Sequence, residues 1–95
     1  MIALQIYLTA QEGKEKELED AYLNFFRPAI KKQEGYKNIV MLKDDSQMRT
    51  YELNLFFETE ALRQKWVASD DHQKAWPKIA ACCANASWYL FSVID

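Results

Sequence analysis

The chain has few glycines, cysteines and histidines, the residues of glycine-rich phosphate loops and of thiolate or imidazole metal sites. Its 95 residues include only two glycines, two cysteines and one histidine. Nucleotide-binding loops need closely spaced glycines, so Gly13 and Gly35 cannot form one. A metal site needs several converging ligands, which a lone histidine and two neighbouring cysteines do not supply. The composition therefore predicts a protein without a bound metal, and it excludes the common nucleotide-binding motifs.

Strong charge and long apolar runs are also missing. The formal net charge is −2 and no basic stripe is present, which argues against a nucleic-acid partner. No segment approaches the ~18 consecutive apolar residues of a membrane span, and a strand-like pattern begins at Ile2, so we expect a cytoplasmic protein with no membrane partner. Cys82 and Cys83 are adjacent, and we expect them to be reduced and to act as small apolar residues.

What the chain does contain is a strand and helix pattern of high apolar content. The residues are 49% hydrophobic and 14% aromatic. Strand-like segments lie at 2–9, 38–43, 51–57 and 88–94. The first helical pattern follows an apolar stripe from Leu18 to Ile30, and we expect Pro28 to kink it and Gly35 to follow its end.

The second helical region is interrupted, and we expect pieces at 60–68, 70–76 and 77–84. Thr59 and Ser69 are suitable N-caps, and Pro77 suits the first turn of a further short helix. The resulting order, β-α-β-β-α-β, predicts a ferredoxin-like α+β fold with an antiparallel sheet and a single domain over residues 1–95.

Both faces of the predicted strands are apolar, although the helices can cover only one face of the sheet. The other face would expose some of Tyr7, Phe56, Tyr89 and Phe91. A chain this short also buries only roughly 60–70% of its surface. We therefore expect a homodimer whose sheets face each other around a site for a small aromatic or apolar ligand.

His72 is the only histidine and the best candidate for a general base. Trp66 and Trp76 flank it in the same helical region and could form the walls of a site for a planar ligand. Each has a plain structural alternative, since the tryptophans could simply fill the core and His72 could lie on the surface beside two aspartates.

Several other residues are candidates for orienting or contacting a ligand. Asn54 lies on the strand face opposite its neighbouring leucines, and its amide could orient a ligand oxygen if that face is interior. Arg27 could bind an anionic group, with a salt bridge as the alternative. The aromatic candidates, each of which could equally be a core or interface residue, are Tyr7, Tyr51, Phe56 and Tyr89.

Two segments resemble the antibiotic biosynthesis monooxygenase family. Residues 66–72 (Trp-Val-Ala-Ser-Asp-Asp-His) are close to that family's second-helix motif of an aromatic or His, then Ser, then His at three-residue spacing. Residues 27–36, with Glu34 and Gly35 before the aromatic Tyr36, resemble its first-helix exit. The resemblance implies a dimeric α+β barrel. It also implies oxygenation of phenols, anthrones or quinols without metal or flavin, with the protein supplying deprotonation, orientation and an apolar pocket.

The same resemblance raises two alternatives. A haem-degrading branch uses a first-strand Asn together with a Trp and a His of the second helical region. Trp66 matches it, but Ile6 and Trp76 stand near the other positions, so we do not expect haem oxygenation. The second alternative is a non-catalytic ligand-binding or dimerisation module of the same fold, because polar catalytic groups beyond His72 are scarce.

Overall fold

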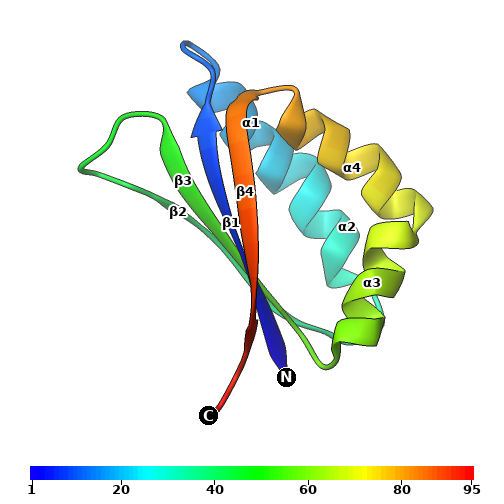
Figure 1. The fold of residues 1–95 in the computed structure, drawn as a ribbon. Helices are drawn as coiled ribbons and strands as arrows, with labels where there is room; N and C mark the ends of the chain where they lie inside the picture. The colour runs from blue at the N-terminus through cyan, green and yellow to red at the C-terminus, as the bar shows by residue number, and fades with distance from the viewer.

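The strands of the computed structural model, which describes all 95 residues, form one antiparallel sheet in the order β2-β3-β1-β4. Figure 1 shows the helices together on one face of this sheet. This is the predicted ferredoxin-like β-α-β-β-α-β arrangement. In chain order the elements are β1 (Ile2–Ala10), α1 (Glu15–Ala21), η1 (Tyr22–Phe26, a π-helical segment), α2 (Arg27–Lys31), β2 (Tyr36–Lys43), β3 (Thr50–Phe57), α3 (Glu60–Ala68), α4 (Asp70–Ala80) and β4 (Cys83–Ser92).

The two faces of the sheet differ in what covers them. Along β3, buried Leu53 and Leu55 face the helices and alternate with partly exposed residues of the opposite face. On that opposite face Tyr7, Tyr89 and Phe91 remain 39%, 54% and 47% exposed. The prediction of an exposed aromatic sheet face is therefore confirmed for the single chain.

The first helix departs from α geometry just before Pro28. In the π-helical segment η1, the backbone N–H of Arg27 donates to the carbonyl of Tyr22, five residues earlier. Proline lacks a donor and crowds the carbonyl four residues before it, here that of Asn24. A wider turn at this point accommodates the proline, and the helix continues as α2.

Gly35 follows the helix end and lies against α3. Its φ of +82° is in the left-handed region. A Cβ at this position would come within 2.6 Å of Cδ1 of Leu62. The chain therefore uses glycine here both for its backbone conformation and for the close approach of α3.

The break between α3 and α4 is where the caps predict it. The side chain of Thr59 accepts a hydrogen bond from the N–H of Leu62 at 3.2 Å, and Ser69 caps α4 in the same way. The prediction of a second break at Pro77 is wrong, because α4 runs unbroken from Asp70 to Ala80. Ala75 and Ile79 are buried on either side of the proline, and this packing outweighs the lost backbone bond.

The last strand is longer than predicted. It begins at Cys83 rather than residue 88 and ends at Ser92. Its first residues are small or polar and carry no strand pattern, but they pair with β1 in a register that ends at Ala10 opposite Cys83. Pairing with a central strand imposes the extended conformation that local sequence does not indicate.

Candidate active site

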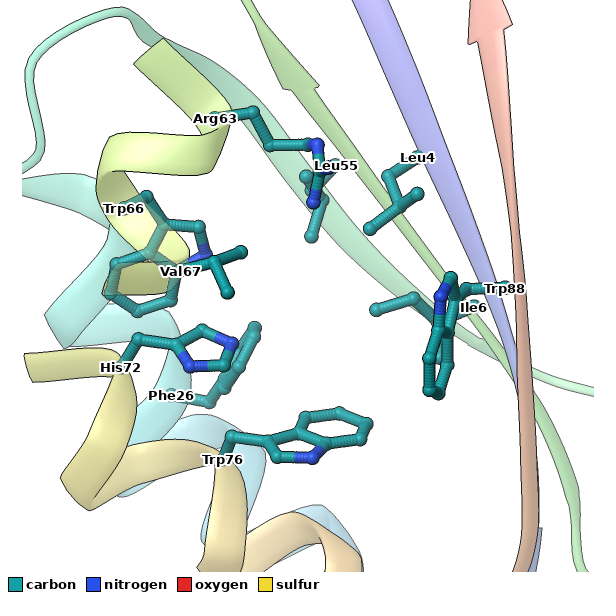
Figure 2. A pocket seen from close by; sticks show the side chains of 10 residues that line it. All are labelled: Leu4, Ile6, Phe26, Leu55, Arg63, Trp66, Val67, His72, Trp76 and Trp88. Atoms are coloured by element: carbon teal, nitrogen blue, oxygen red, sulfur yellow. The ribbon is translucent and has the colours of Figure 1, made fainter. Parts of the chain in front are cut away.

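A cavity of about 290 Å³ lies between α3, α4 and the helix-facing side of the sheet. Figure 2 shows side chains converging on it from η1, α3 and α4 on one side and from β1, β3 and β4 on the other. Eight of its ten lining residues are hydrophobic, and all three tryptophans of the chain are among them. The lining residues are Leu4, Ile6, Phe26, Leu55, Arg63, Trp66, Val67, His72, Trp76 and Trp88.

Aromatic rings form the helical wall of this cavity. The centroid of Trp66 lies 4.9 Å from that of His72, with the rings at 83° to each other, while Trp76 stacks on His72 at 6.3 Å and 15°. Phe26 meets Trp66 edge to face at 5.6 Å. Such contacts hold each ring in one orientation, and the wall they form can stack on a planar ligand.

His72 is placed by the first turn of α4. The Ser69 side chain accepts from the N–H of His72 at 3.2 Å, and its hydroxyl donates to the carbonyl of Trp66 at 2.6 Å. Ser69 therefore fixes the end of α3 against the start of α4, and with it the position of Trp66 relative to His72. In Figure 2 the Nε2 edge of the imidazole points toward the cavity, while Nδ1 is buried and without a protein partner.

The environment of His72 favours the neutral imidazole. Burial lowers its pKa below the ordinary 6.5, and the nearby positive charge of Arg63 lowers the pKa further. A neutral imidazole at neutral pH has a lone pair available to accept a proton. The residue that the sequence singled out as a base therefore lines the cavity in the form that a base requires.

Arg63 is the one charged residue among those that line the cavity, and sequence reasoning missed it. Its side chain is 17% exposed, and its Nε donates to the carboxylate of Glu60 one turn earlier. Neither Nη group makes a hydrogen bond within the chain. A signal was present, because Arg63 stands three and four residues before Trp66 and Val67 and so shares their face of α3.

Four other predicted site residues lie on the opposite face of the sheet. Asn54, Tyr7, Phe56 and Tyr89 project away from the helices and do not line the cavity. The Tyr7 hydroxyl donates to Gln5 at 3.1 Å, and the Tyr7 ring meets Tyr89 edge to face at 5.8 Å. Oδ1 of Asn54 is buried on this face without a partner.

Tyr51 and Arg27 are also outside the cavity. Tyr51 is buried under the helices and donates to Glu19 at 2.5 Å, and burial together with that carboxylate raises the pKa of Tyr51. It lines a separate cavity of about 160 Å³ beside Lys43. The guanidinium of Arg27 lies 6.0 Å from the centre of the Tyr22 ring and forms no salt bridge.

The arrangement combines an apolar aromatic chamber with one imidazole and one guanidinium. No group of three or more His, Cys, Asp or Glu side chains is placed to hold a metal ion. The structure also contains no helix with the length and apolar content of a membrane span. The cavity can enclose a planar ligand, accept a proton at His72 and attract negative charge at Arg63. These features allow a bound organic molecule to be deprotonated to its anion away from bulk water.

Solved structures with the same fold include one described as a cofactor-independent oxygenase. SnoaB, a cofactor-independent oxygenase from Streptomyces nogalater, matches with a TM-score of 0.89 over 99% of this chain and 93% of its own, at 13% identity. A Caulobacter crescentus protein assigned provisionally to the antibiotic biosynthesis monooxygenases matches with a TM-score of 0.88 over 99% of this chain and 90% of its own, also at 13% identity. At these identities the likeness shows the fold alone.

Membership of a family comes from the sequence itself. No functionally curated protein matches the chain significantly in sequence. The sequence profile of the antibiotic biosynthesis monooxygenases, however, matches residues 1–78, which includes three strands, α3 and most of α4. The chain therefore belongs to the antibiotic biosynthesis monooxygenase family.

Proposed function

We propose that the cavity binds a small phenol, anthrone or quinol and supports its oxygenation by molecular oxygen without a metal or an organic cofactor. The observation that carries this proposal is the position of His72, whose neutral imidazole borders an aromatic cavity built from elements far apart in the chain. Family membership supports this class of reaction, and the position of His72 on the cavity wall supports its role in it.

The cavity suits a compact planar substrate. Its volume of about 290 Å³ is near the lower end of the ~300–1,000 Å³ typical of ligand pockets, which fits a few fused rings. The rings of Trp76 and Trp88 meet at 89°, so a planar ligand can stack on one and present its edge to the other. Leu4, Ile6 and Leu55 supply an apolar floor from the sheet.

His72 would begin the reaction by removing a proton from the bound substrate. The bond from the acidic carbon or oxygen to hydrogen breaks, and Nε2 of His72 takes the proton. The substrate anion then donates electrons to oxygen, which enters the same cavity. For an anthrone the balance is one CH₂ and one O₂ giving one C=O and one water, so no external reductant is needed. The protein's part is binding, deprotonation and exclusion of water.

The protein would act as a homodimer. The sheet face away from the helices carries exposed Tyr7, Val40, Leu42, Tyr89 and Phe91. A sheet face that exposes several large apolar side chains on a small chain is typical of a protein interface. A second copy facing it would bury at least ~800 Å² on each subunit, the standard size for a stable complex.

Oxygen uptake with reduced naphthoquinols and anthrones, corrected for autoxidation, tests this function. The wild type should accelerate uptake, and His72→Gln should lower the rate by roughly 10²–10⁴-fold while the fold is retained. Gln64→Ala, at an exposed position of α3, is the control for a surface change. Equal rates for wild type and His72→Gln would refute the role of His72. Binding without uptake over a broad substrate panel would favour the alternative of a non-catalytic ligand-binding module.

A further inference from the structure

We infer that Arg63 binds the ionised oxygen of the ligand, so that the cavity selects planar aromatic compounds with an acidic hydroxyl or enol over their neutral analogues. The inference deepens the proposed function and rests on it for the reaction, but ligand selection can be measured without turnover. Sequence reasoning considered Arg27 for anion binding, with a salt bridge as the alternative, and the structure places Arg27 outside the cavity.

The guanidinium of Arg63 has unused donors where a ligand would lie. Its Nε is paired with Glu60, and no protein group accepts from either Nη. Figure 2 shows the side chain reaching from α3 toward Leu55, with the guanidinium at the edge of the cavity. The two Nη groups of an arginine form a planar fork that matches a pair of adjacent oxygen atoms.

Glu60 orients this fork and does not block it. A carboxylate bound at Nε restrains the guanidinium plane while the terminal donors stay free. The pair is partly buried, with 17% of the Arg63 side chain and 29% of the Glu60 side chain exposed. Arg63 is also the only lining residue with a fixed positive charge, and eight of the other lining residues are apolar. In such apolar surroundings electrostatic attraction is stronger than in water.

Arg63 and His72 would divide the work of making the anion. When His72 removes the proton from a substrate hydroxyl, the O–H bond breaks, an N–H bond forms at Nε2, and the negative charge remains on the substrate oxygen. The positive charge of Arg63 lowers the free energy of that anion in the cavity. The same charge disfavours protonation of His72 in the free protein, so the imidazole stays neutral and able to accept a proton.

The experiment compares two ligands that differ in charge but are already oxidised. The first, 2-hydroxy-1,4-naphthoquinone, is an ionised enol at neutral pH, and the second, 2-methoxy-1,4-naphthoquinone, is its neutral analogue. All three tryptophans of the chain line the cavity, so quenching of intrinsic fluorescence, corrected for ligand absorbance, reports its occupancy. The wild type should bind the hydroxy compound more tightly than the methoxy compound.

Variants at Arg63 identify the source of this preference. Arg63→Gln should weaken binding of the anion by roughly 10–100-fold and leave binding of the neutral analogue unchanged, which removes the preference. Arg63→Lys keeps the charge but lacks the fork, so it should retain part of the preference. Arg27→Gln makes the same change of charge outside the cavity and should keep the wild-type preference. Because Arg63→Gln leaves Glu60 unpaired, the double variant with Glu60→Gln is measured beside it to keep the site neutral.

The outcomes separate this inference from the proposed function. A wild type that binds both quinones equally, or a preference that survives in both Arg63→Gln and the double variant, would overturn the inference even if oxygen uptake occurs. A preference that depends on Arg63 supports it even if no substrate is oxidised, in which case the oxygenase proposal fails and a selective anion-binding protein remains.

Discussion

Replacing Trp66 with alanine should separate the structural and ligand-binding contributions of the cavity wall when it is compared with the same change at Trp88. Trp66 is 2% exposed and contacts Phe26 and His72 at centroid distances of 5.6 and 4.9 Å, whereas Trp88 is 59% exposed at the edge strand β4. Truncation of a buried aromatic side chain costs about 3–5 kcal/mol. For an exposed residue we expect a cost below about 1 kcal/mol.

These values can be checked by urea unfolding and by thermal melting. A loss of 3–5 kcal/mol is a large part of the ~5–15 kcal/mol that stabilises an ordinary domain, and it corresponds to a fall in Tm of roughly 12–40 °C for a chain of this size. Trp88→Ala should melt near the wild type. Both variants should bind 2-methoxy-1,4-naphthoquinone more weakly, because each removes one wall of the cavity.

Equal unfolding free energies for the two variants would refute the conclusion that Trp66 is part of the core and that Trp88 contributes little to stability. Unchanged quinone affinity in Trp88→Ala would show that ligands do not reach the sheet side of the cavity.

Three further predictions concern His72, Gly35 and metal dependence. The pKa of folded His72 is lowered, so its contribution to stability is complete above about pH 6.5 and is lost as the pH falls toward the folded pKa. When the pH falls from about 7.5 to 5, the free energy of urea unfolding should therefore drop less in His72→Gln than in the wild type, and an equal drop in both proteins would contradict this. Gly35→Ala should destabilise by roughly 1–3 kcal/mol and by more than Gly13→Ala, because both glycines have a positive φ but only Gly35 would place a Cβ against Leu62; equal losses would refute the steric part. Oxygen uptake should persist after dialysis against a chelator, and loss of uptake that added metal restores would contradict a metal-independent reaction.

The sequence predicted the fold well where local signals and packing agree. Strand alternation, the caps at Thr59 and Ser69 and the order of elements all correspond to the structure. The predictions were wrong where tertiary contacts determine the backbone conformation. Helix α4 continues past Pro77 because its neighbouring residues are buried, and β4 begins as early as Cys83 because it pairs with β1.

The candidate site was less predictable because it joins distant parts of the chain. The second helical region placed His72 beside Trp66 and Trp76, since Trp66 lies six residues before His72 and Trp76 four residues after it, around a capped break. Which sheet face borders the cavity depends on the side that the helices cover, and alternation alone leaves that open. For that reason Asn54 and Tyr89 were candidates although they face away, whereas Trp88 was not considered. Arg63 was missed although it shares the face of α3 that carries Trp66.

Turnover of an anthrone under ¹⁸O₂, followed by mass spectrometry of the product, tests the central claim most directly. The account predicts that wild-type protein, without added metal or cofactor, forms the quinone with one ¹⁸O in the new carbonyl. After correction for the uncatalysed background, His72→Gln should form it roughly 10²–10⁴-fold more slowly. Product oxygen derived from water, or equal labelled product with and without the protein, would contradict an oxygenase function.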